Sequence, residues 1–533
     1  MATALLIGMP VRAETSAVDP LWPSCGENKV SGVNKFMLGP KAAQALTPKA
    51  IPEIAMQRCT LALDDPGMNA APWQRRVSLL RWRARHAIAA YQPEAAMADL
   101  EVIKSIEQPD LVYARSMGVS LLMIRALALV EMKRPEEAAV PAIEAANLRP
   151  WSERTAAFAL LIAELHPAIS PIEQKLWTQY VRLNPVARQR RALRLAANGD
   201  WNGALADWKR VTPPPGGISD TFVQVANVKV RGMPGVPVRS VDIPRTGQAA
   251  LAAAMAGEAG TARQWIAAAR NVIASPPAPG PTQRVIGVNA DPAIQNAELD
   301  TWEQIVTAAI EYRSGNANMA GSRLTAMKEA PLTPVILAMF QEISDALPAA
   351  QRSDMLRDVP ATKAKYAAYQ EEQRTWVADI ERLLLELPDH EDTTPNNRYG
   401  SKVMFLRASG FKETPKKDGS GLTINYFGTK STPLAVGEMA LLRAAELAEN
   451  KGLSAFLITD RSDFKQLMTP TMWGMPSGPT VTSGYGSNID VVLVDPAALP
   501  SSLAGVDDQL IDTASIKAAL VPIYLQGQEK PKR

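Results

Sequence analysis

Cysteine and histidine are the scarcest chemically active residues of this chain of 533 residues, which has two cysteines and three histidines. His86, His166 and His390 lie far apart in the sequence and share no ligand-like spacing. A zinc site or a histidine-based catalytic triad would need partner residues for which the sequence shows no pattern. We therefore expect no metal, no cofactor and no catalytic residue, and we expect that the protein is not an enzyme.

An excess of one charge is also missing, because 57 basic residues face 54 acidic residues and the net charge is +3. A nucleic-acid-binding protein usually concentrates lysine and arginine on one face, so no nucleic-acid partner is predicted. The arginines gather in two helical stretches, at Arg75, Arg76, Arg81, Arg83 and Arg85 and at Arg188, Arg190, Arg191 and Arg194. We expect solvated helix faces there, and an anionic envelope partner is the alternative.

Long hydrophobic runs are absent after residue 13, so no transmembrane span is predicted. Before it, Ala2 to Val11 is a short apolar run, and Val11-Arg12-Ala13 resembles a signal-peptidase site. The basic segment that begins such a signal is missing. We interpret residues 1–13 as the remainder of a signal peptide whose true start lies upstream, which predicts a periplasmic or otherwise exported protein.

The two cysteines lie in the segment 14–70, which we interpret as an N-terminal cap. In an oxidising compartment, a disulfide between Cys25 and Cys59 can persist. Such a bridge contributes roughly 3–4 kcal/mol to stability in the loop-entropy description. The alternative is two unrelated buried thiols.

Residues 71–387 carry a helical pattern in which short turns separate pairs of alanine-rich helices. Met123 to Leu129, followed by Pro135-Glu136-Glu137-Ala138 and Pro150, is the clearest pair. Similar patterns surround four further turns, at Tyr91, Gly199, Gly257 and Gly315. The pattern resembles tetratricopeptide (TPR) repeats, in which small residues lie where two antiparallel helices touch. Because the turns are unevenly spaced, the resemblance implies an irregular TPR-like α-solenoid with a concave surface.

Two stretches interrupt this helical pattern, near 213–245 and 275–298, and both are rich in proline and glycine. We expect loops or hairpins that project from the array, because strand-like alternation occurs inside them. Long ordered insertions often carry function, with tolerated decoration as the alternative. Ala361 to Leu387 is predicted to be one long helix, and the polar residues 388–400 are predicted to be a linker.

The C-terminal residues 401–525 are organised around one amphipathic helix. Thr432 is a good N-cap, Pro433 suits the first helical position, and Gly452 can close the helix. A predicted β-hairpin precedes this helix, and a strand from Ala455 to Thr459, a second strand and a closing helix follow it. The order hairpin, helix, strand, strand, helix predicts a small α+β domain, with a disordered tail at 526–533.

Two stretches of this region carry a family resemblance: Ile424 to Thr429, and the Leu-x-Arg-Ala-Ala-Glu sequence from Leu441 to Glu446. They resemble a family of small alphaproteobacterial lipoproteins of Caulobacter type, which are envelope proteins of unknown function. The chain departs from that family at Thr429 and in lacking a lipid-attachment cysteine. The resemblance implies a fold and a compartment but no catalytic residue. Arg443 and Glu446 lie three residues apart and are predicted to form a structural ion pair.

The loop after the central strand is rich in methionine and tryptophan, which are common at adaptable binding surfaces. Met472, Trp473 and Met475 are therefore a candidate partner-binding loop, although such residues more often cover a sheet face. Asp460 and Asp495 are the nearest approach to paired carboxylates, and strand-end aspartates usually serve turns.

We therefore predict an exported scaffold that binds a protein or peptide of the cell envelope on the concave face of its helical array. The alternative is an enzyme that acts on an envelope polymer, or a protein that binds a small ligand. A permanent subunit of an export or assembly machine would differ from the scaffold only in the lifetime of its complex.

Overall fold

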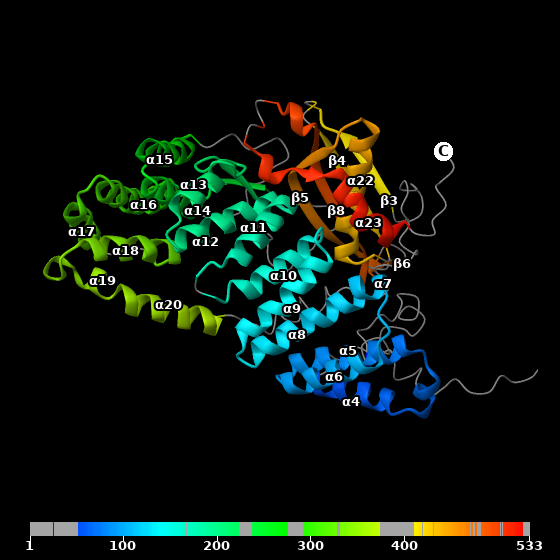
Figure 1. The fold of residues 1–533 in the computed structure, drawn as a ribbon. Helices are drawn as coiled ribbons and strands as arrows, with labels where there is room; N and C mark the ends of the chain where they lie inside the picture. Colours follow the sequence, from blue (N-terminus) through cyan, green and yellow to red (C-terminus); the bar gives the residue numbers. More distant parts are fainter. Residues whose placement is uncertain are drawn as a thin grey trace, which may run out of the picture. The chain divides into compact units, whose positions relative to one another are not determined.

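The computed structural model describes Cys25 and residues 52–166, 168–222, 237–275, 291–327, 331–373 and 410–525, with short gaps at 418, 420, 430, 469–470, 473–474, 477–480, 501–502 and 504. The chain is mostly helical and has a small antiparallel sheet in its C-terminal part (Figure 1), which confirms the predicted mainly α class. It forms two compact units: unit 1 is Met1–Pro167 with Trp376–Arg533, and unit 2 is Ala168–Thr375.

The N-terminal part of unit 1 is a series of helices in which neighbours along the chain pack together. These helices are α4 (Pro52–Leu63), α5 (Trp73–Ala89), α6 (Pro93–Ile106), α7 (Leu111–Tyr113), α8 (Val119–Glu131), α9 (Pro135–Leu148) and α10 (Glu153–Ala163), with a π-helical segment η2 (Ala114–Gly118) between α7 and α8. The pairs α5–α6 and α8–α9 are two of the predicted helical pairs.

Unit 2 contains the remaining predicted pairs. Its helices are α11 (Pro171–Leu183), α12 (Arg188–Ala197), α13 (Trp201–Trp208), α14 (Ile243–Met255), α15 (Ala259–Ala274), α16 (Pro292–Arg313), α17 (Ala317–Ala326), α18 (Pro334–Ala346), α19 (Asp354–Arg357) and α20 (Val359–Gln373). A two-stranded hairpin, β1 (Ile218–Phe222) and β2 (Pro237–Val241), lies in the first predicted insertion. Most of the second insertion, residues 374–387 of the predicted long helix and the linker 388–400 lie outside the described residues.

Five helix–helix turns of the described chain share one backbone geometry. Each has a residue in the left-handed region, namely Tyr91, Lys133, Gly199, Gly257 and Gly315, with φ values of 56°, 61°, 81°, 87° and 87°. The N–H groups of this residue and of the next residue donate to carbonyls in the last turn of the preceding helix, which is the Schellman arrangement. Tyr91 and Lys133 show that two of the turns form without glycine, at a cost of about 1–2 kcal/mol each.

Alanine occupies the same two positions around each of these turns. The positions seven residues before the left-handed residue are Ala84, Ala126, Ala192, Ala250 and Ala308, and those five residues after it are Ala96, Ala138, Ala204, Ala262 and Ala320. All ten alanines have 0% exposure. A methyl group at both positions lets the two helices of each pair approach closely, so the pairs repeat in detail although their spacing along the chain is irregular.

Helix α14 is the centre of unit 2. Eleven of its thirteen residues are buried, which is typical of a helix surrounded by others and not of a surface helix. It packs against α13, α15 and α16, and α18 packs back against α12. The Trp201 indole N–H donates to Glu342 Oε1 at 2.5 Å, so α13 and α18 are joined although 141 residues separate them. These contacts reach beyond neighbouring pairs and enclose α14.

The C-terminal sheet has five strands in the order β3-β4-β8-β5-β9, and all neighbours are antiparallel. The strands are β3 (Gly410–Pro415), β4 (Leu422–Gly428), β5 (Ala455–Met468), β8 (Val481–Val494) and β9 (Ile511–Asp512). The strand predicted from Ala455 to Thr459 is thus much longer. The closing helix, predicted from Ile511 to Tyr524, is also corrected, because Ile511 and Asp512 form β9 and helix α23 (Thr513–Tyr524) begins after them.

Helix α22 (Pro433–Asn450) packs on β4, β5 and β8, and α23 packs against α22 (Figure 1). Its predicted start and stop are confirmed: the Thr432 hydroxyl accepts from the Ala435 N–H, and Gly452 has a φ of 72°. Thirteen residues of α22 are buried, which explains why its sequence is so apolar. One of them is a carboxylate, Glu438.

The structure joins Cys25 and Cys59 in a disulfide. Both residues are fully buried beside Met68, Leu79 and Trp82, and the Cys25 carbonyl oxygen lies 2.9 Å from His86 Nε2. The bridge therefore attaches Cys25 to α4, and the contact with His86 attaches it to α5.

Opening this bridge is expected to destabilise unit 1 by about 3–4 kcal/mol, since it closes a loop of 34 residues. The measurement is thermal unfolding with and without a thiol reductant, compared with a Cys25→Ser/Cys59→Ser variant. The variant should unfold at a lower temperature than the oxidised wild type, with and without reductant. A stabilising role would be contradicted if the melting temperature of the wild type stays the same after reduction, when a thiol reagent shows that both cysteines are free.

Candidate functional site

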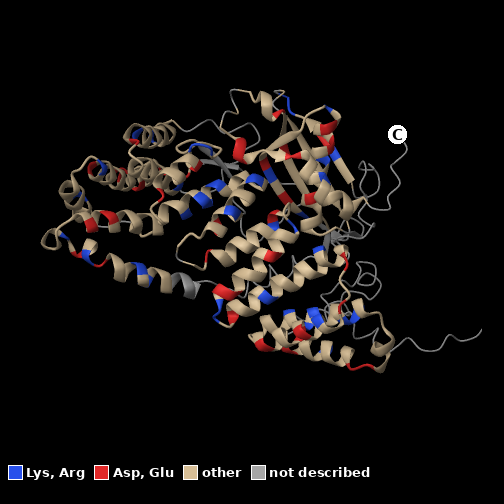
Figure 2. Cartoon of the chain, viewed as in Figure 1, with Lys and Arg blue, Asp and Glu red and all other residues tan. Residues whose placement is uncertain are grey.

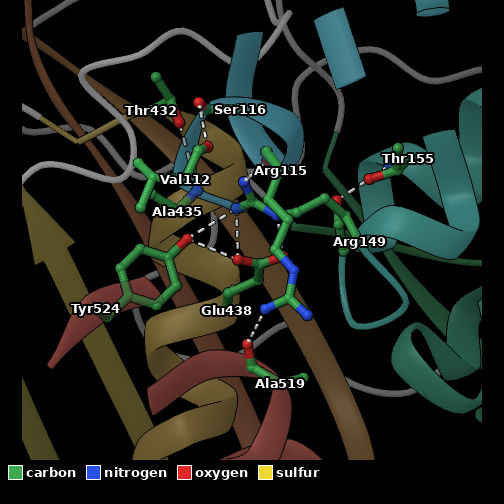
Figure 3. A network of polar contacts seen from close by, with 11 residues as sticks. Val112, Arg115, Ser116, Arg149, Thr155, Thr432, Ala435, Glu438, Ala519 and Tyr524 are labelled. Atoms are coloured by element: carbon green, nitrogen blue, oxygen red, sulfur yellow. Dashed lines mark hydrogen bonds and ion pairs between the residues drawn. The ribbon is translucent and has the colours of Figure 1, made fainter. Parts of the chain in front are cut away.

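A buried polar network joins the N-terminal helices of unit 1 to its C-terminal domain (Figure 3). Arg149, at the end of α9, donates to Glu438 of α22 from Nε at 2.8 Å and from Nη2 at 2.5 Å. The same Nη2 donates to the Tyr524 hydroxyl at 2.8 Å, and this hydroxyl donates to Glu438 Oε2 at 2.6 Å. The side chains of Arg149, Glu438 and Tyr524, which come from the end of α9, from α22 and from α23, therefore satisfy one another's hydrogen-bonding groups.

Arg115 extends this network to the backbone of α23. Its Nη1 donates to the Ala519 carbonyl at 2.9 Å, while its own carbonyl accepts from Arg149 Nη1 at 2.5 Å. The arginines thus contact both helices of the C-terminal domain.

A second charged group lies on the same side of the sheet. Asp463 of β5 accepts from Arg461 at 3.0 Å and from the Ser487 hydroxyl at 2.7 Å. Burial opposes ionisation of Asp463, but the charge and hydrogen bond of Arg461, the Ser487 hydroxyl and the charge of Arg154 outweigh it and lower its pKa. Arg461 is accommodated against α22 because residue 437 is glycine, where a Cβ would lie 2.4 Å from Arg461 Nη2.

The Arg149–Glu438 pair is closed to solvent, with side-chain exposures of 0% and 1%. A reaction site needs a cavity that admits substrate, and the pair is instead satisfied by protein groups on each side. Its geometry is that of a structural contact between two parts of unit 1.

An open groove lies between α16 and α17 in unit 2, with a volume of about 950 Å³. It is lined by Asp300, Thr301, Gln304, Glu311, Asn318, Met319, Ser322, Arg323, Ala326 and Met327. Met319 is 56% exposed, which is high for a large apolar side chain. The volume is comparable to that of pockets that hold a small molecule or a few peptide side chains.

The charged side chains of this groove are held in place by one another. Arg323 donates to Glu311 through Nε at 3.0 Å and Nη2 at 2.5 Å, and through Nη1 to Gln304 at 2.8 Å. The hydrogen bond with Glu311 raises the pKa of Arg323. At the α15 side, Arg270 donates to Asp300 at 2.7 Å and to Glu303 at 2.6 Å. The groove therefore offers exposed apolar atoms between fixed polar groups.

Arg443 and Glu446 form the predicted ion pair at 2.7 Å. Arg443 also donates from Nε to Glu413 of β3 at 2.6 Å and lies 4.2 Å from the centre of the Phe411 ring. The guanidinium therefore connects α22 to the edge strand of the sheet, in agreement with a structural role.

Of the candidate partner-binding loop, Met472 lies in β6 (Thr471–Met472) and Met475 in β7 (Met475–Pro476), and these two residues pair in a small ribbon. Trp473 lies outside the described residues. The structure therefore places the two methionines together on a ribbon, and a partner for them stays a prediction.

Asp460 and Asp495 do not both lie at strand ends as expected. Asp460 lies inside β5 beside an irregularity in the pairing with β8, whereas Asp495 accepts from the Ala497 N–H and caps a short helical turn. Among the described residues no group of three or more His, Cys, Asp or Glu side chains is placed to hold a metal ion.

The arginine clusters are only in part the solvated faces that the sequence suggests, since Arg76 and Arg190 are exposed and other members are buried. Arg81, Arg85 and Arg188 are only 3%, 7% and 2% exposed. Arg81 donates to Ser120, and both Arg81 and Arg85 lie over the Trp82 ring. In unit 2, Arg191 is paired with Asp207 and Arg194 with Glu173. Figure 2 shows basic and acidic residues interspersed along the helices. The prediction of open basic faces is wrong at these positions, because internal partners take up the charge.

One described helical stretch, Leu111–Glu131, is long and apolar enough to cross a membrane by length and composition. About 61% of its apolar window is buried inside the protein, as in a core helix.

Comparison with protein-family models, with curated proteins and with solved structures finds no match to this chain. The resemblances to TPR repeats and to the small lipoproteins therefore stay predictions.

The sequence carries one further signal of the helical pairs. The alanines seven residues before and five residues after each turn could have been aligned on the turn residue, and this would have shown that the pairs are equivalent. Arg149, Glu438 and Tyr524 had no such signal, because each is a single polar residue in an otherwise ordinary helix.

Proposed function

We propose that the protein is an exported scaffold built from irregular TPR-like helical pairs, and that it binds a segment of a cell-envelope protein. The observation that carries the proposal is the repeated turn, with its two buried alanines, in five helical pairs. Repeated pairs of this type serve as rigid supports for protein binding. The compartment rests on the sequence of residues 1–13 and is supported by the disulfide.

The partner surface that we propose is the groove between α16 and α17. We expected the partner on the concave face of an open helical array. Since α14 is enclosed by other helices, we propose this groove instead. Its exposed methionine and its fixed charged rim suit an extended peptide that places apolar side chains between polar contacts. Methionine fits such side chains well because it is flexible and polarisable.

Met319→Glu is expected to reduce partner capture at least about tenfold, because a carboxylate would replace an exposed apolar side chain of the groove. The fold should tolerate it, since Met319 is 56% exposed and lies in the first turn of α17, where an acidic residue is favourable. The measurement is photo-crosslinking in the native host with the crosslinker at Asn318, followed by mass spectrometry of the envelope fraction.

The matched control is Ile294→Glu, which changes an equally exposed apolar residue near the start of α16 that does not line the groove. This variant should retain the partner. If crosslinking at Asn318 returns no reproducible protein, or if both variants behave alike, the groove is not the partner site.

A further inference from the structure

The two parts of unit 1 that meet at Arg149 are distant in the sequence. The Arg149–Glu438 contact spans 289 residues, and the Arg115–Ala519 contact spans 404 residues. All of unit 2 is inserted between them. Bringing the two parts together therefore costs loop-closure entropy, which contacts between them must offset.

We infer that Arg149, Glu438 and Tyr524 form a lock that makes the N-terminal helices and the C-terminal sheet domain one body. The C-terminal domain thus does not move independently of the N-terminal helices. The inference does not depend on what the α16–α17 groove binds.

The geometry favours a specific lock over a general adhesive surface. Both Glu438 oxygens are engaged by Arg149, and a two-pronged contact between a planar guanidinium and a carboxylate fixes orientation as well as distance. Tyr524 bonds to both members, so α23 is positioned by the same contact as α22. A small shift of the C-terminal domain would separate the two charges before water could reach them, which is unfavourable.

The two parts of unit 1 supply complementary groups to the contacts around the pair. Arg115 reaches the backbone of α23, and α10 packs against α22. The N-terminal helices therefore supply cations, and the C-terminal domain supplies a carboxylate, a hydroxyl and a helix carbonyl. This complementarity identifies the C-terminal domain of the same chain as the occupant of this surface.

The test uses the full chain with a protease site introduced within 388–400, cut after purification and examined by size-exclusion chromatography at micromolar concentration. The C-terminal fragment should elute with the remainder of the chain. In Arg149→Ala it should elute alone, with the dissociation constant raised at least about 100-fold. Tyr524→Phe, which removes only the hydroxyl, should raise it about tenfold.

The control is Arg134→Ala, which removes an exposed ion pair with Glu137 at the start of α9 and should leave the fragment bound. If Arg149→Ala does not fold, Tyr524→Phe and the isosteric Glu438→Gln decide the outcome. The lock is refuted if the C-terminal fragment of the cut wild type elutes alone. It is also refuted if the variants at Arg149, Glu438 and Tyr524 bind the fragment as tightly as Arg134→Ala does.

Discussion

Replacing Glu438 with alanine is expected to lower the free energy of unfolding of unit 1 by about 3–5 kcal/mol. The change removes the Glu438 carboxylate from the Arg149 guanidinium, which has 0% side-chain exposure. It keeps the Tyr524 hydroxyl and the Arg115 carbonyl, but neither carries a charge. Removing the charged partner of a buried ion pair is among the few single changes with so large an effect.

Because two compact units need not unfold in one step, the measurement is hydrogen exchange followed by segment, under native conditions. Amides of α9, α22 and β8 should lose protection, while those of α14 in unit 2 should not. The matched control is Glu446→Ala, which removes a partly exposed partner of Arg443 on the same helix and should cost less than about 1 kcal/mol.

A double replacement, Arg149→Met with Glu438→Leu, separates charge from packing. If the buried pair supplies specificity more than stability, this apolar variant should be close to the wild type in stability. If Glu438→Ala, Glu446→Ala and the double variant all lower the free energy of unfolding equally, the loss in Glu438→Ala is not caused by an unbalanced buried charge.

Gly247→Ala is expected to destabilise unit 2 by about 1–3 kcal/mol or more, although alanine is normally the better helix former. Gly247 lies in α14, where a Cβ would be 2.0 Å from Trp302 Cδ2 and 2.4 Å from Cγ. Trp302 is 2% exposed within the core, so its ring has little space into which to move. The overlap can be relieved only by displacing α14 or α16.

The measurement is thermal unfolding, in which a loss of this size lowers the melting temperature of unit 2 by several degrees. Gly260→Ala is the matched control, since Gly260 lies in α15 with nothing within 4 Å of its added Cβ. It should be neutral or stabilising by up to about 1 kcal/mol. If Gly247→Ala is as stable as Gly260→Ala, the close helix crossing is not under steric control.

Local features of this protein could be predicted from the sequence by itself. The cap at Thr432, the stop at Gly452 and the turns at Gly199, Gly257 and Gly315 follow from backbone preferences that act within a few residues. The mainly helical class with a small C-terminal sheet follows from hydrophobic periodicity, which is also local.

Only the tertiary structure decided which distant elements meet. The buried arginines Arg81 and Arg188 were expected in solvent, because nothing near them in the sequence shows that Ser120 and Asp207 lie beside them. In the same way, Glu342 joins Trp201 across 141 residues, and Glu438 joins Arg149 across 289. A single charge in a helix has the same local pattern whether its partner is water or a distant side chain. Its free energy depends on burial, which is a property of the assembled fold.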